Sequence, residues 1–173
     1  MLSKWLVYLA LVIVKATTPS TIPEFKLTSK GVEPIVIQLN NTSAKDMYAK
    51  TKDWIKETYY DPDEVIKAEF QNKKIRISGP AEKAYSYKVL GKNYTGGIDY
   101  ELIVEFKKNR YRLSFIIDKN DMHLIKTNFF KKDGEMTKYG KQAIPDIEKT
   151  MNELSSSLYN YLSSNEIDQS DEW

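Results

Sequence analysis

The sequence predicts an α+β domain built as a two-layer sandwich, in which helices pack on one face of an antiparallel β-meander. Through the middle of the chain, between residues 65 and 117, apolar side chains tend to recur at every second position, which is the period of strands. On either side of this region they recur every three or four positions, as they do in amphipathic helices. Each helix then has one apolar stripe and each strand one apolar face, so the two layers must pack on each other. The length of 173 residues suits a single domain with short appendages.

The first predicted strand covers residues 35–39, a short run rich in β-branched side chains that ends at Asn40 and Asn41. A helix follows, because Ser43 with Asp46 three residues later is typical of a helix start. Residues at helical spacing then continue to the Asp61-Pro62-Asp63 stop. These residues are Met47, Thr51, Trp54 or Ile55, and Thr58.

The meander is predicted to start with a hairpin of residues 65–70 and 74–78. A Tyr-rich strand at residues 85–90 leads through Gly91 to a turn at Gly96-Gly97. The clearest pair comes last, since residues 98–106 and 111–117 alternate apolar and polar side chains on the two sides of a turn at residues 107–110.

The region from Asp118 to Gly140 has only a short apolar patch among polar residues, and we expect a strand followed by a loop there. A long amphipathic C-terminal helix comes next, with Pro145 tolerated in its first turn. Its apolar stripe consists of Ile144, Ile147, Met151, Leu154, Leu158, Tyr161 and Leu162. Residues 165–173 read as an acidic tail.

The N-terminus resembles a secretory leader. Lys4 precedes ten apolar residues, Trp5 to Val14, which is the length of a signal-peptide core and too short for a membrane span. Lys15 directly after the run is atypical, and a buried N-terminal helix or strand is the alternative. We expect cleavage after Ala16, a linker over residues 17–33, and one domain over residues 34–164.

The register of the strands predicts a second sheet face that no helix covers, and this face is the candidate partner-binding surface. We assign to it Arg76, Ile103, Arg112 and Ile116, beside Glu101 and Glu105, and we add the mid-chain Tyr85 and Tyr87 because aromatic rings with hydroxyl groups suit sugar or peptide contacts. The alternative is that the tyrosines are half-buried strand residues and the arginines form cross-strand charge pairs.

The sequence contains no recognisable catalytic or metal-binding pattern. There is no cysteine, and the single His123 has no partner motif that would make it a catalytic base, so a hydrolase using His123 is only a remote alternative. Asp118-Lys119-Asn120-Asp121 starts like a calcium loop, but the later ligand positions are not filled. The formal net charge of +2 is too balanced for a nucleic-acid surface. We therefore expect no enzyme activity, no cofactor, no metal and no nucleic-acid partner.

Three stretches resemble an exported bacterial family, domain of unknown function 4468. They are the helix segment Tyr48 to Ile55, the strand Lys74 to Gly79, and the pair Tyr100 to Phe106 with Arg110 to Phe115. The resemblance covers about residues 34–118 and implies a TBP-like β-α-β(4-5)-α fold, a periplasmic or extracellular location and no known activity. Family members often carry a lipoprotein cysteine, which is missing here. A TBP-like fold does not itself imply DNA binding.

The sequence therefore favours a non-enzymatic exported module, without a stable membrane span after leader cleavage, that binds an envelope protein, peptide or glycan on the open sheet face. The alternative is a carrier in which the C-terminal helix grips a small apolar ligand against a curved sheet.

Overall fold

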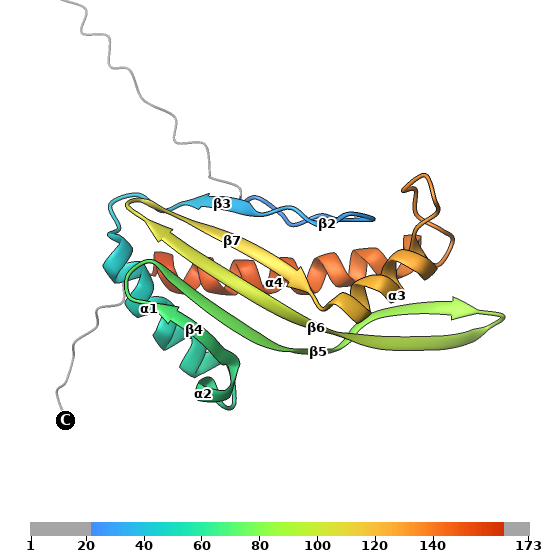
Figure 1. Ribbon diagram of the computed structural model, residues 1–173, viewed down its shortest axis with the longest axis horizontal. Coiled ribbons are helices and arrows are strands. Elements are labelled where there is room, and N and C mark those ends of the chain that lie inside the picture. Colours follow the sequence, from blue (N-terminus) through green and yellow to red (C-terminus); the bar gives the residue numbers. More distant parts are fainter. Residues whose placement is uncertain (1–21, 165–173) are drawn as a thin grey trace, which may run out of the picture.

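One layer of the molecule is a five-stranded antiparallel sheet. In a computed structural model that describes residues 22–164, the strands are β3 (Ile35–Gln38), β4 (Ile66–Phe70), β5 (Lys74–Val89), β6 (Lys92–Lys107) and β7 (Arg110–Ile117). Their order in the sheet is β3-β7-β6-β5-β4. β5 and β6 are much longer than their neighbours, and their far halves extend as a two-stranded hairpin beyond the sheet (Figure 1).

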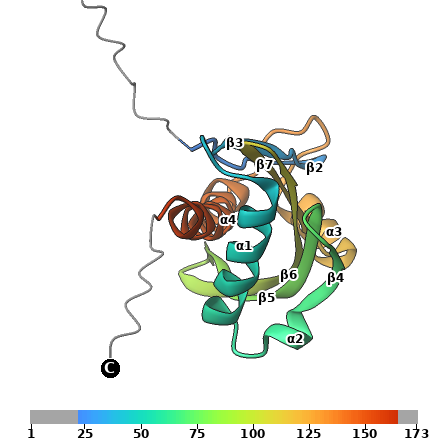
Figure 2. The same ribbon diagram turned by 90° about the vertical axis from the view of Figure 1, so that its left-hand side faces the viewer.

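Helices α1 (Ala44–Thr58) and α4 (Gly140–Ser163) form the second layer and cover one face of the sheet (Figure 2). In α1 the hydroxyl of Ser43 accepts a hydrogen bond from the backbone N–H of Asp46, which is the helix start that the sequence predicts. The indole N–H of Trp54 donates to the hydroxyl of Ser157 at 3.0 Å and joins the two helices. The predicted α+β fold class, with its antiparallel sheet and long C-terminal helix, is confirmed.

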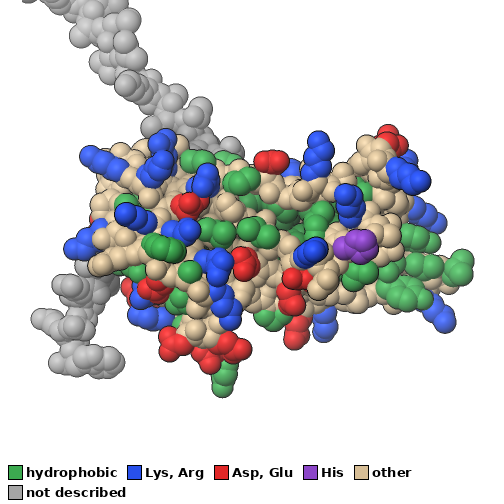
Figure 3. Space-filling model, in the orientation of Figure 1, with side chains coloured by type: hydrophobic (Ala, Val, Ile, Leu, Met, Phe, Trp, Pro, Cys, Tyr) green, Lys and Arg blue, Asp and Glu red, His purple; other side chains and the backbone are tan. Residues whose placement is uncertain are grey.

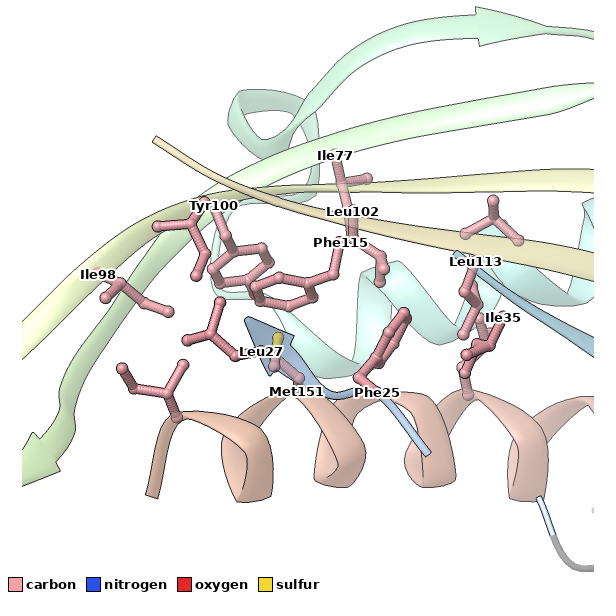
Figure 4. Close-up of a cluster of buried hydrophobic side chains, with 14 of the residues drawn as sticks. Phe25, Leu27, Ile35, Ile77, Ile98, Tyr100, Leu102, Leu113, Phe115 and Met151 are labelled. Carbon is pink, nitrogen blue, oxygen red and sulfur yellow. The ribbon is translucent and has the colours of Figure 1, made fainter. Parts of the chain in front are cut away.

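The core lies between the sheet and the two helices α1 and α4. Side chains from the strands, from α4 and from the N-terminal segment interlock there, and Phe115 stacks on Tyr100 with ring centroids 4.7 Å apart (Figure 4). Every second residue of β6 from Ile98 to Phe106 is buried, and so is every second residue of β7 from Tyr111 to Ile117. The alternation predicted for this pair of strands is therefore what builds the core.

The segment before β3 differs from the predicted linker over residues 17–33. Phe25 and Leu27 are buried in the core, and β1 (Leu27–Thr28) pairs with β2 (Gly31–Val32) as a short hairpin. The amide of Asn152 on α4 binds the backbone of Phe25 through both of its ends, at 2.7 and 3.2 Å. The predicted leader (residues 1–16), the start of the linker and the acidic tail (residues 165–173) lie outside the described residues.

Two predictions in the second half of the chain are wrong. The expected turn at Gly96-Gly97 is part of β6, and the chain instead turns at Leu90-Gly91. The strand-then-loop expected after Asp118 is a helix, α3 (Lys119–Phe129), whose N-terminus is capped by the Asp118 carboxylate. A further short helix, α2 (Pro62–Val65), starts at the Asp61-Pro62-Asp63 stop.

Candidate binding face

The sheet face opposite α1 and α4 is crossed by rows of side chains that the strand register brings side by side. One row runs from Arg76 to Ile103 to Ser114, and the next from Ser78 to Glu101 to Ile116. All six residues are partly or fully exposed. The sequence assigned Arg76, Ile103, Arg112 and Ile116 to this face, and the structure places all four there.

The two arginines on this face are paired with carboxylates of the neighbouring strand. Arg112 on β7 donates to Glu105 on β6 through its Nε at 2.7 Å, and a guanidinium nitrogen of Arg76 lies 4.0 Å from Glu101. Exposed pairs of this kind contribute at most about 1 kcal/mol to stability. The apolar side chains that stand out on this face include Phe70 at the β4 edge, which is 55% exposed, and Ile116 on β7 near α3, which is 47% exposed.

A groove of about 1080 Å³ lies over the Ser78–Glu101–Ile116 row, and this row forms its floor. One wall comes from α2 and the start of β4, with Val65 and Lys67, and the other from α3, with Met122 and His123. Figure 3 shows this face, with the His side chain beside scattered hydrophobic, basic and acidic groups. The groove therefore combines an apolar floor position with a rim of both charge signs.

The sequence does not predict the α3 wall, because the pattern from Asp118 to Gly140 favours a strand and a loop, whereas the structure has a helix over Lys119–Phe129. A signal for the helix was present: Met122, Ile125 and Phe129 are spaced by three and four, and Asp118 stands at the N-cap position. This stripe is short and lies among polar residues, so it did not outweigh the surrounding pattern.

Tyr85 and Tyr87 do not belong to the open face. Both rings turn to the other side of the β5–β6 hairpin, where they stack on each other at 6.3 Å and meet the edge of Phe129 from α3 at 5.2 and 5.4 Å. Tyr94 on β6 continues the stack at 5.6 Å from Tyr87. The candidate surface of six residues is thus divided between two places, four on the open face and two in an aromatic stack on the hairpin.

His123 lies on the exposed surface of α3 at the groove rim. Within residues 22–164 its imidazole has no hydrogen bond to Ser114 or to any other side chain, and only its carbonyl accepts one, from the Thr127 hydroxyl at 2.8 Å. Three or more His, Asp or Glu side chains arranged as metal ligands do not occur in the described part of the chain. No helix of the described residues is long and apolar enough to cross a membrane.

The arrangement defines a class of protein: an α+β domain in which an antiparallel sheet has one face closed by helices and the other open. The model of one family, described as a domain of unknown function (DUF4468) with TBP-like fold, matches residues 35–116. The resemblance inferred from the sequence is thereby confirmed, and the fold is TBP-like.

Two solved structures have the same fold. A DUF4468 family protein from Bacteroides ovatus matches with a TM-score of 0.55 at 12% identity, over 83% of this chain and 91% of its own. A TBP-like protein from Parabacteroides distasonis matches with a TM-score of 0.51 at 14% identity, over 76% of this chain and 92% of its own. No curated protein sequence matches the chain. At these identities the likeness concerns the fold alone.

Proposed function

We propose that this chain is an exported, non-enzymatic binding module that holds an extended peptide segment of a partner protein in the groove on its open sheet face. The observation that carries the proposal is the groove itself, because its floor presents the exposed Ile116 between two walls that come from separate parts of the chain. A groove of this size, open along the sheet, suits a chain segment better than a small ligand, which is normally enclosed on most sides.

The charges around the groove favour a peptide over a nucleic acid. Lys67, Lys119 and Lys126 line it together with Glu64, Asp99, Glu101 and Asp118, so basic and acidic groups are nearly balanced. A phosphate backbone would be repelled by four carboxylates and would gain little from releasing counterions. A peptide that carries both basic and acidic side chains can form ion pairs with residues on either wall.

The alternative of a small apolar ligand held between α4 and the sheet has no observation in its favour. The space where such a ligand would lie is filled by Phe25, Leu27, Phe115 and Met151, all of them buried (Figure 4). A ligand there would have to displace core side chains, and each would cost several kcal/mol.

The peptide-binding proposal is tested with a phage-displayed library of random peptides. Wild-type protein is expected to enrich a set of related peptides, and Ile116→Glu is expected to lose their binding, because a carboxylate would replace the apolar floor position. Leu124→Glu is the matched control, since Leu124 is 53% exposed on α3 and does not line the groove. Peptides that bind all three proteins equally by fluorescence polarisation would contradict the proposal, and so would a wild-type selection without enrichment.

Export is the second part of the proposal, and it rests on the apolar run of Trp5 to Val14 with Ala16 two residues after it. The intact mass of the chain recovered outside the cytoplasm is expected to correspond to a start at Thr17. A chain that is found only in the cytoplasm, or that keeps Met1, would contradict export.

A further inference from the structure

The tip of the β5–β6 hairpin carries an apolar side chain in full contact with solvent. Val89 pairs with Lys92, so Leu90 and Gly91 form a two-residue turn, and the side chain of Leu90 is fully exposed. The hairpin extends from one end of the molecule (Figure 1), and hydrophobic side chains gather at this end in the space-filling view (Figure 3).

Leu90 is unfavourable for the fold on two counts. Both turn residues have positive φ, 48° at Leu90 and 81° at Gly91, and the first position of such a turn normally holds Asn, Asp or Gly. A leucine there is strained, because its Cβ crowds the backbone in the left-handed region. The Leu90 side chain also gains no hydrophobic stabilisation, because it is not buried. Natural proteins break local rules of this kind mainly at functional or strained sites.

The surroundings of Leu90 are cationic and aromatic. Lys88 and Lys92 flank the turn and are exposed, and the ring of Tyr94, 46% exposed, stacks on Tyr87 behind them. Two further exposed lysines, Lys138 and Lys141, lie on either side of Tyr139 in the sequence, and the Tyr139 ring contacts Tyr87 at 5.6 Å.

These four lysines take part in none of the ion pairs found within residues 22–164. The aliphatic stems of lysines and the rings of tyrosines suit the boundary between lipid headgroups and acyl chains, where one end of a side chain is apolar and the other is wet. Trp and Tyr are enriched at this boundary.

We propose that the hairpin tip is a membrane-surface anchor, in which Leu90 enters the headgroup layer of an anionic bilayer while Lys88, Lys92, Lys138 and Lys141 contact lipid phosphates. A lipid surface fits the tip better than a protein partner does. A stable protein interface buries about 800 Å² on each side and needs a broad surface, whereas the tip is the narrow end of a two-stranded hairpin (Figure 1). Peripheral lipid binding combines a small apolar insertion with about 1 kcal/mol, or about fivefold in affinity, per basic residue near an anionic surface.

The test is co-sedimentation with vesicles of phosphatidylcholine alone or mixed with phosphatidylglycerol. The protein starts at Thr17, so that it lacks the apolar leader and keeps every residue of the described domain. We expect binding to the mixed vesicles only, and we expect it to weaken with added salt. Leu90→Asn is expected to reduce the affinity about tenfold, since the lost leucine burial is worth at least that factor. Lys88→Glu with Lys92→Glu is expected to reduce it at least as much.

Leu90→Asn also separates loss of the anchor from loss of the fold. Asn tolerates positive φ, so this variant is expected to have the same melting temperature as wild type or a higher one, although its binding to vesicles is weakened. Leu124→Asn, a substitution of another exposed leucine, is expected to bind vesicles as wild type does.

Because the chain has no cysteine, a fluorophore sensitive to polarity can be attached at Leu90→Cys alone. The emission of this fluorophore is expected to shift to the blue when mixed vesicles are added. The same fluorophore attached at Leu124→Cys is the control, and its emission is expected to stay unchanged. Wild-type protein that leaves mixed vesicles unbound would overturn the proposal, and so would equal binding by Leu90→Asn. Peptide binding in the groove is a separate readout that Leu90→Asn leaves unchanged.

Discussion

Tyr59 and Tyr100 hold their hydroxyl groups 2.9 Å apart at the end of α1, next to the open position that Gly79 leaves on β5. Burial is the main cause that raises the pKa of both phenols, and for Tyr59 the neighbouring Tyr100 adds to it. The hydrogen bond from Tyr59 acts in the opposite direction on Tyr100 and is the smaller effect. At a pH at which an exposed tyrosine already ionises, both side chains are therefore still neutral in the folded protein.

This pair makes the stability of the fold depend on pH in alkaline solution. The pKa of a phenol in the unfolded chain is 10.0, and the folded value is higher, so above about pH 10 the unfolded state releases protons that the folded state keeps. The contribution of these two phenols to the free energy of unfolding is then constant below this pH and falls above it. Each such tyrosine contributes a slope of up to about 1.4 kcal/mol per pH unit.

Tyr59→Phe removes one of these groups, and its stability is expected to fall less steeply than that of wild type between about pH 10 and about pH 11. The measurement is urea unfolding at several pH values, with the difference between the two slopes as the readout. Parallel curves would show that Tyr59 ionises equally in both states and would contradict the burial argument.

At the scale of elements, the sequence predicted those whose apolar period is long and unbroken. The sequence predicts the neighbouring strands β6 and β7 and the helix α4 because, in each of these elements, the apolar period continues over eight or more residues. α3 was missed because its buried residues are only Ile125 and Phe129, too few to stand out from the polar residues around them.

The glycine pair at positions 96 and 97 misled the prediction for a different reason. Two adjacent glycines usually indicate a turn, but here they permit close packing inside a strand. A Cβ on Gly96 would lie 2.3 Å from the Tyr85 ring, and one on Gly97 would lie 2.9 Å from the carbonyl oxygen of Ala81. The true turn, Leu90-Gly91, carries a leucine where turn chemistry calls for a polar residue, so its sequence signal was weak.

The candidate site shows the same division between local and tertiary information. Ile116 and its row on the sheet followed from the period of two in β7, which is local. The groove over that row requires α2 and α3 to lie on opposite sides of the sheet face, which is a tertiary fact that no local pattern contains. The separation of Tyr85 and Tyr87 from the open face is local information too: they have the odd-numbered alternation of the buried Ile75 and Ile77 on β5, and the irregular pairing between Ala81 and Tyr85 adds two residues, which leaves the face unchanged.

At the scale of the whole molecule, α4 connects parts of the chain that are far apart in sequence. Its Asp146 carboxylate accepts from the backbone N–H of Ser86 at 3.0 Å, and its Gln142 amide oxygen accepts from that of Lys88 at 3.1 Å, so α4 covers the outer edge of β5. Covering an edge in this way removes free backbone groups that another strand could pair with.

The segment before β3 is joined to the same helix and serves as part of the core. The backbone N–H of Leu27 donates to the Glu148 carboxylate at 2.9 Å, and Phe25 lies within 6.0 Å, centroid to centroid, of the ring of Phe115 on β7. The domain therefore begins before Pro34, because the groups that satisfy the backbone of this segment and bury its side chains all belong to the described fold.

Phe25→Ala tests whether this segment contributes to the stability of the domain. The Phe25 side chain is fully buried, and removing a buried phenylalanine ring typically costs about 3–5 kcal/mol, since the lost transfer free energy adds to that of the cavity left behind. Lys30→Ala is the control in the same segment, because Lys30 is exposed and its substitution is expected to change the free energy of unfolding by less than about 0.5 kcal/mol. Urea unfolding followed by near-UV circular dichroism measures both variants against wild type. If Phe25→Ala proved as stable as Lys30→Ala, residues 22–33 would be the linker that the sequence predicts, and the domain would begin near Pro34.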